Sequence, residues 1–173
     1  MEKGTQKLKV FEIGTPLKYV RDIELPGLGS VKKTWGNNTE FFFGYTSFSD
    51  PGSQYRVDMK NFNVERIYTT KLSINAPDVT EFTTDRVEYK SKDGTMIPMF
   101  IVRKKSVLQT VNQKPQKPIP TLIHAYGGFG VVKTPYFSNS RLIWMNNMEG
   151  IFVYAGIRGG GEYGEMWHKA GAK

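Results

Sequence analysis

The first 79 residues contain short apolar or alternating runs separated by turn residues, and none of these runs has a helical period. Alternation with a period of two and aromatic enrichment, as in 40–48, are typical of strands packed on one face of a sheet. Asp50-Pro51-Gly52 has the residues of a tight turn, because proline fixes φ at the second position and glycine accepts a left-handed conformation. The runs that we expect to form strands are 7–13, 19–25, 31–35, 40–48, 54–59 and 66–72.

This spacing of strands and turns predicts a meander, a sandwich or part of a β-propeller in residues 1–79. We find no internal repeat, so the segment supplies at most one propeller blade and part of another. The stretch Asn75-Ala76-Pro77-Asp78 interrupts the pattern with turn residues and marks the expected boundary with the rest of the chain.

Residues 80–173 begin with a predicted hairpin whose strands are 82–89 and 96–102. Pro98 lies inside the second strand and indicates an edge position or a bulge, because proline cannot donate a hydrogen bond to a ladder. A polar connector with three prolines follows at 107–120.

Two apolar runs in this half each stop abruptly in glycines, at 121–130 and 151–161, and we expect both runs to be buried strands. The segment between them includes a predicted helix within 135–148, capped by Ser138 or Asn139 and stopped by Gly150. Strand, helix and strand together predict a βαβ crossover. Since chemistry in open α/β sheets gathers at the carboxyl ends of strands, we expect any function near 126–129 and 158–163. The expected fold class is therefore α/β.

Composition narrows the class of protein. The chain has 173 residues and no cysteine, which excludes disulfides and thiolate chemistry. No apolar run has the length of a signal peptide core or a membrane span, so we expect a cytoplasmic protein. The net charge is +8, of which +6 lies in residues 80–173. The excess is concentrated in Arg103, Lys104, Lys105, Lys114 and Lys117. We interpret this group as a solvated loop and regard nucleic-acid binding as the least favoured function.

The residues at the ends of the two apolar runs each have a structural and a functional interpretation. Tyr126 could donate its hydroxyl to an oxyanion or simply cap the core, and spacing alone favours the cap. Arg158 is expected to pair with an acid such as Glu162, because the neighbouring glycines match neither phosphate-binding motif. His124 and His168 have no metal-ligand spacing. We expect no cofactor and no metal.

No serine has the glycine-flanked elbow that an acyl-transfer nucleophile needs. Ser138, Glu149 and His168 occur in the order of a hydrolase triad, but Ser138 lies at the predicted start of a helix and lacks flanking glycines. We interpret that order as coincidence. The residues alone therefore provide no complete catalytic constellation.

The sequence nevertheless resembles a known family. The stretches DGTMIPMFIVRKK (93–105), HAYGGFGVVKTPYFSNSRLIW (124–144) and IRGGGEYGEMWHKAG (157–171) resemble the prolyl oligopeptidase (prolyl endopeptidase) family of S9 serine peptidases, in the same order and spacing. The aromatic stretch 41–59 resembles the last propeller segment of that family.

The resemblance implies a β-propeller followed by an α/β-hydrolase domain, with residues 1–79 as the end of the propeller and 80–173 as the start of the hydrolase domain. It implies a serine peptidase that cleaves short peptides after proline. Tyr126 matches the oxyanion-hole tyrosine, and Phe129 matches a phenylalanine of the pocket for the substrate proline. The implied partners are short proline-containing peptides, without nucleic acid or membrane, and the full-length parent is expected to be a monomer.

The same resemblance implies a fragment, because the catalytic serine, aspartate and histidine of the family pattern lie beyond Lys173. We expect this chain by itself to be inactive, since without a nucleophile no acyl intermediate forms. We also expect it to aggregate or to be partly disordered when expressed alone, because strand edges and apolar faces would be uncovered. The alternative is a non-catalytic β-rich module, from a truncated product, that binds peptides or a protein.

Overall fold

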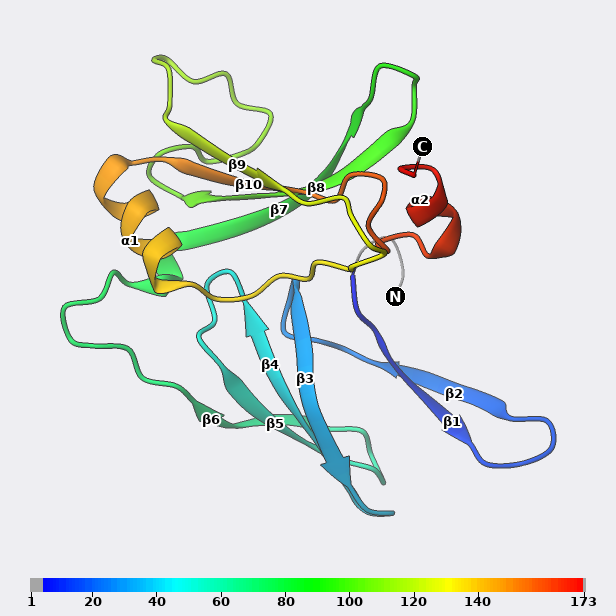
Figure 1. Cartoon of the computed structure of the whole chain (residues 1–173). Helices are drawn as coiled ribbons and strands as arrows, with labels where there is room; N and C mark the ends of the chain where they lie inside the picture. Colours follow the sequence, from blue (N-terminus) through cyan, green and yellow to red (C-terminus); the bar gives the residue numbers. More distant parts are fainter. Residues whose placement is uncertain (1–4, 173) are drawn as a thin grey trace.

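The computed structural model describes residues 5–172, which form three sheets and two helices (Figure 1). The smallest sheet is the hairpin of β1 (Leu8–Glu12) and β2 (Lys18–Ile23). The second sheet contains, in order, β3 (Gly29–Gly36), β4 (Glu40–Ser47), β5 (Ser53–Asp58) and β6 (Val64–Thr69). The 3₁₀ turn η1 (Val79–Glu81) leads into the third sheet.

The sheet β3–β6 is antiparallel throughout, as the alternating pattern of residues 1–79 predicts. Along β5, buried and half-buried positions alternate, so one face packs into a core while the other is partly solvated. That core contains the stacked rings of Phe43 and Tyr55, whose centroids are 5.1 Å apart, together with Val57 and Ile23. Packing of apolar side chains at a period of two thus fixes which face of each strand is inward.

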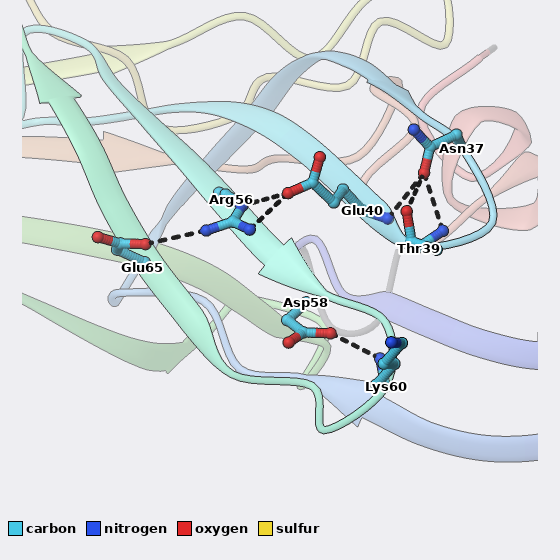
Figure 2. A network of polar contacts seen from close by, with 7 residues as sticks. All are labelled: Asn37, Thr39, Glu40, Arg56, Asp58, Lys60 and Glu65. Carbon is cyan, nitrogen blue, oxygen red and sulfur yellow. Dashed lines mark hydrogen bonds and ion pairs between the residues drawn. The ribbon is translucent and has the colours of Figure 1, made fainter.

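Polar contacts on the same sheet reinforce its register (Figure 2). The Oδ1 atom of Asn37 accepts hydrogen bonds from the backbone N–H groups of Thr39 and Glu40 at 2.8 and 2.9 Å, which closes the turn between β3 and β4. Arg56 on β5 then bridges two neighbouring strands, with 2.6 Å from its Nε to Glu40 Oε1 and 3.5 Å to a carboxylate oxygen of Glu65. Cross-strand charge pairs of this kind are modest in energy at an exposed surface but penalise a slipped register.

The third sheet has the strand order β7-β8-β10-β9 and is mixed. Antiparallel pairs join β7 (Phe82–Lys90) to β8 (Met96–Lys104) and β8 to β10 (Ile151–Ala155). The strands β9 (Thr121–Ala125) and β10 are parallel and are connected through α1 (Asn139–Met148). The short helix α2 (Glu165–Lys169) follows the glycine segment after β10.

The α/β prediction is therefore right only in part. One parallel pair and its crossover helix match it, whereas the other strand pairs in residues 5–172 are antiparallel. Most of these pairs join strands that are consecutive in the chain, and short connections favour antiparallel pairing, but β8 and β10 are antiparallel although β9 and α1 lie between them. The predicted boundary at 79/80 falls in the connection between β6 and β7. The division into two domains itself remains a prediction. In the described part of the chain, no helix is long and apolar enough to cross a membrane.

Pro98 was expected at an edge or a bulge, but β8 is an interior strand paired regularly with β7 and β10. The proline is tolerated because the pairing of β8 with β10 stops at Met99. Its carbonyl accepts a hydrogen bond from the N–H of Gly156 at 2.9 Å. Since the N and O of one residue point to the same side of a strand, the missing donor of Pro98 faces the position just past the end of β10.

The predicted burial of β9 is wrong. All five of its residues are exposed in this chain, and the side chain of Ile123 is 67% exposed. The strand lies at the edge of the sheet, and its apolar side chains face no covering layer among the described residues. Its apolar sequence and its parallel pairing are features that sheets usually show when they are covered.

Contacts between the two four-stranded sheets include the Phe48 side chain and the segment 126–138. Phe48, which follows β4, packs into the core of the mixed sheet against Phe100, Phe152 and Tyr154. The chain from 126 to 138 runs between the two sheets (Figure 1). It is bonded to the β3–β6 sheet by Ser30 Oγ, which donates to the carbonyl of Pro135 at 2.5 Å. The N–H of Phe137 donates to Thr46 Oγ1 at 3.3 Å.

The basic loop predicted from composition needs one correction. Arg103 is not solvated, because its side chain is among the largest that are fully buried. Its guanidinium donates to the carbonyls of Leu108 and Gln109 at 2.7 and 2.9 Å and forms an ion pair with Asp85. These bonds replace the water that a buried cation loses, and they hold the start of the 107–120 connector against the sheet.

This burial yields a prediction for stability. In the full-length protein that carries this segment, Arg103→Met is expected to lower the free energy of unfolding by about 2–3 kcal/mol, because two carbonyls and Asp85 lose their partner. Urea unfolding followed by circular dichroism measures the change. The neighbouring Lys104→Met loses a partly exposed ion pair with Glu81 and a contact with the Phe82 ring, and it should cost about 1 kcal/mol or less. Equal costs for the two variants would contradict the assignment.

Candidate functional site

Tyr126 lies directly after the carboxyl end of β9, beside the parallel strand β10 that ends in register with it. Its side chain is 48% exposed, and its hydroxyl makes no hydrogen bond to any residue in 5–172. The Nζ atom of Lys133 lies over its ring, 4.8 Å from the centroid. The phenol is therefore available to donate a hydrogen bond to a ligand.

The backbone that carries Tyr126 is packed against the glycine segment after β10. A Cβ atom on Gly159 would lie 2.1 Å from the carbonyl oxygen of Gly127, and a Cβ on Gly161 would lie 2.4 Å from that of Gly130. Hydrogen bonds join the same two segments, from Gly130 N to Gly159 O at 3.0 Å and from Gly161 N to Val131 O at 3.3 Å. Only residues without a side chain allow such a close approach of two backbones.

Phe129 lies in the tight turn between these contacts. Its φ of +54° is unusual for a residue with a side chain, and the N–H of Val131 donates to Gly128 O across the turn at 3.0 Å. The ring is 88% exposed. The turn therefore presents the ring to solvent, not to the core, where a ligand could contact it.

Glu162 is a buried carboxylate beneath this loop, 6% exposed. Its Oε1 accepts from the backbone N–H of Lys133 at 3.3 Å, while Oε2 has no partner within the described residues. The hydroxyl of Tyr154 is also buried without a partner there. Burial raises the pKa of Tyr154, and the Glu162 carboxylate raises it further, so the phenol is neutral at any physiological pH.

Arg158 was expected to pair with Glu162, and the structure shows a different partner. Its guanidinium forms an ion pair with Asp93 in the turn between β7 and β8, and it also contacts Thr95 Oγ1 at 3.4 Å. Arg158 thus links the loop after β10 to the hairpin tip. The hydrogen bond from Arg158 lowers the pKa of Asp93 to about 2, with help from the backbone N–H of Thr95.

The remaining candidates have structural roles. His168 Nδ1 is 2.8 Å from the carbonyl oxygen of Gly159, and the ring of His124 stacks on Tyr154 at 5.2 Å. Ser138 is the cap of α1 and accepts from Arg141 N. Since Glu149 follows the other end of that ten-residue helix, about 15 Å away, the two cannot form a triad with His168. Within residues 5–172, no group of three or more His, Cys, Asp or Glu side chains could hold a metal.

The structure brings together residues that the sequence pattern did not connect. Lys133 contacts Tyr126 across seven positions, and Glu162 anchors the backbone of Lys133 across 29 positions. Neither contact has a sequence signal, because Lys133 lies in an irregular segment and Glu162 follows three glycines. Phe129 and Tyr126 lie in the same loop, as expected, but their roles in chemistry remain predictions.

The fold and the site define a chain with antiparallel propeller-type strands, followed by a mixed sheet with a glycine-rich edge. Residues 1–69 match the family model described as the N-terminal beta-propeller domain of prolyl oligopeptidase. Beyond those residues, the chain is similar to prolyl endopeptidases along most of its length. It is 37% identical over 158 residues, or 90% of this chain, to the prolyl endopeptidases of Elizabethkingia meningoseptica and Dictyostelium discoideum.

A comparison with a solved structure also shows similarity to a prolyl oligopeptidase. Prolyl oligopeptidase B from Galerina marginata, bound to a 35mer hydrolysis and macrocyclization substrate, superimposes with a TM-score of 0.78 at 32% identity over 95% of this chain. The match takes in 23% of that protein. The chain spans about a fifth of the length of the curated relatives that it matches, 21% and 20% for the two endopeptidases.

The close packing of the two glycine segments gives a prediction. In the full-length protein, Gly159→Ala is expected to cost about 3–4 kcal/mol, since it combines a positive φ with a collision against the Gly127 carbonyl. Gly94→Ala is the matched control, because Gly94 also has a positive φ but nothing within 4 Å, and it should cost about 1–2 kcal/mol. The urea midpoints of the two variants measure this difference in stability. If Gly159→Ala costs no more than Gly94→Ala, the predicted collision with the Gly127 carbonyl does not occur.

The ion pair between Arg158 and Asp93 predicts a pH dependence. The folded-state pKa of Asp93 is lowered from 3.8 to about 2, so its contribution is fully present above pH 3.8 and is lost as the pH falls towards 2. Asp93→Asn should therefore lower the unfolding midpoint at pH 6 and leave it unchanged near pH 2. Glu149→Gln, whose carboxylate forms no ion pair with a described residue, is the control. An effect of Asp93→Asn that persists at pH 2 would contradict this account.

Proposed function

We propose that this chain is part of a serine peptidase that cleaves short peptides on the carboxyl side of proline. The observation that carries the proposal is the Tyr126 hydroxyl, which is free of bonds to residues 5–172 and is presented at the carboxyl end of β9 by a backbone that glycine contacts hold in place. The relatives that match over 90% of the chain are prolyl endopeptidases, which supports the same conclusion.

The two halves have different parts in this proposal. Residues 1–79 are the end of a β-propeller, supported by the family match over 1–69 and by the antiparallel sheet β3–β6. Residues 80–173 are the first part of an α/β-hydrolase domain. The support for that half is the parallel pair β9 and β10 with α1 between them, which places two loops side by side at one sheet edge.

In the proposed reaction, a serine supplied by the rest of the parent protein loses its proton to a general base and attacks the carbonyl carbon of the substrate proline, so that negative charge develops on the carbonyl oxygen. The Tyr126 hydroxyl donates a hydrogen bond to that oxygen, and the stabilisation grows as the charge develops. The exposed ring of Phe129 packs against the apolar proline ring. The described residues hold no nucleophile, base or acid in triad geometry, so residues 5–172 stabilise a charge that they do not generate.

The proposed partners are short proline-containing peptides, and the proposed setting is a cytoplasmic monomeric parent without a nucleic-acid or membrane partner. The charge distribution supports the proposed absence of a nucleic-acid partner, because Arg103 is buried and Arg158 is paired with Asp93. These two cations therefore do not contribute to a free basic surface of the kind that binds phosphates.

The alternative is a β-rich module that binds peptides without cleaving them. The exposed aromatic rings of Phe129 and Tyr126 favour it as the second candidate, because they are present whether or not a nucleophile follows. Saturable binding of a proline-containing peptide to the chain, with no cleavage by the full-length protein, would support this alternative.

The test uses the full-length protein that carries this segment and a fluorogenic peptide with an internal proline. Tyr126→Phe is expected to lower kcat about 100-fold or more with little change in KM, because the lost hydrogen bond is made mainly in the transition state. Tyr68→Phe is the matched control, since Tyr68 is a similarly exposed tyrosine on β6, and it should leave kcat unchanged.

Residues 1–173 alone are assayed in parallel and are expected to show no cleavage. Proline-specific hydrolysis by residues 1–173 would overturn the prediction that the chain needs a nucleophile from elsewhere. Equal kcat values for Tyr126→Phe and the wild type would overturn the role of Tyr126. A full-length protein that cleaves no proline-containing peptide would overturn the proposed function itself.

A further inference from the structure

We propose that Lys133 is a positioning residue for the reaction, one that acts through Tyr126 by holding its ring and strengthening its hydroxyl as a hydrogen-bond donor. The inference rests on the proposed function and adds a residue to it. It comes from the juxtaposition of a cation and a free phenol, with the Lys133 Nζ 4.8 Å from the centroid of the Tyr126 ring.

The amino group of Lys133 has no competing partner in residues 5–172. It forms no ion pair with a carboxylate in that range, and the side chain is half-buried. The two arginines of the neighbourhood are engaged elsewhere, Arg158 with Asp93 and Arg141 with the rings of Tyr136 and Phe152. Lys133 is therefore the cation that lies over Tyr126 in the described part of the chain.

The backbone on both sides of Lys133 is fixed, so its side chain starts from a defined point. Its own N–H donates to the buried Glu162, and the carbonyl of Val131 accepts from Gly161 N at 3.3 Å. Two residues further on, the carbonyl of the fully buried Pro135 accepts from Ser30 Oγ. A long lysine side chain held in this way loses less freedom when it covers the ring than one on a mobile loop would.

A cation on the face of an aromatic ring is attracted by the negative charge of that face, and this fixes the orientation of the ring. Its positive charge also favours any negative charge that develops at the far side of the phenol. The substrate carbonyl is neutral in the ground state and anionic in the transition state, so the cation stabilises the transition state more than the bound substrate. Removal of the charge should therefore act on kcat and not on KM.

The experiment is a double-mutant cycle in the full-length protein, with kcat normalised to the active-site concentration measured by titration with an irreversible serine-directed inhibitor. Lys133→Met keeps most of the side-chain length and removes the charge, and it should lower kcat about 3- to 10-fold with KM within about 2-fold. Lys133→Arg keeps the charge and should retain kcat within about 2-fold. Lys60→Met, in the turn after β5, is the surface control.

The cycle is closed by combining Lys133→Met with Tyr126→Phe. We expect Lys133→Met to change kcat by less than about 2-fold in the Tyr126→Phe background, because no hydroxyl remains to be strengthened. Equal losses in the two backgrounds, or no loss from Lys133→Met in the wild type, would overturn the inference and leave the role of Tyr126 intact. If Tyr126→Phe itself changes nothing, the proposed site fails and the inference fails with it.

A loss of folding is distinguished by a second substitution. Lys133→Gln is polar and fits the half-exposed position, so it is expected to keep the thermal midpoint of the wild type and to lower kcat to the same degree as Lys133→Met. A glutamine variant with full kcat would show that the charge has no role and would overturn the inference, whatever the methionine variant does.

Discussion

The arrangement of the candidate site depends on one constraint, the direct contact between the backbones of 127–130 and 159–161. Side chains are excluded there because a Cβ on Gly159 or Gly161 would approach a carbonyl oxygen of the opposite segment to 2.1 or 2.4 Å. Glycine makes this approach possible, and two backbone hydrogen bonds, from Gly130 N to Gly159 O and from Gly161 N to Val131 O, stabilise it. Tyr126 and the left-handed turn at Phe129 lie in or next to the first of these segments, and Lys133 follows it and is anchored by Glu162.

The second glycine segment, 159–161, is held in place by contacts with α2. Trp167 on α2 is buried and donates from Nε1 to the carbonyl of Gly156 at 3.2 Å, while its own carbonyl accepts from Gly159 N at 3.0 Å. The Nδ1 of His168 lies 2.8 Å from the Gly159 carbonyl. These bonds use backbone polar groups next to the site to hold the shape of the glycine segment.

Much of the fold could be predicted from the sequence, because strands with a period of two and glycine-terminated apolar runs report local structure directly. The strands of 1–79 and the hairpin with strands 82–89 and 96–102 follow from such patterns, and of the two predicted caps, Ser138 and Asn139, the structure shows Ser138. Burial could not be predicted equally well, since the apolar sequence of β9 predicts a buried strand whereas its five residues are exposed. Ion pairs between residues that are distant in the sequence could not be predicted, because no local pattern marks them. Arg158 pairs with Asp93, 65 positions away, and not with the nearby Glu162.

The segment between Tyr126 and Ser138 is fastened at one end to the mixed sheet and at the other to the β3–β6 sheet, through Gly130 and Val131 on one side and Pro135 and Phe137 on the other. The segment therefore connects the two sheets, and Lys133 lies near its middle, between the two sets of anchoring bonds. If one sheet rotates against the other, the backbone between Val131 and Pro135 has to change its conformation. A shift of the β3–β6 sheet relative to the mixed sheet would therefore move Lys133, and with it the amino group that lies over the Tyr126 ring.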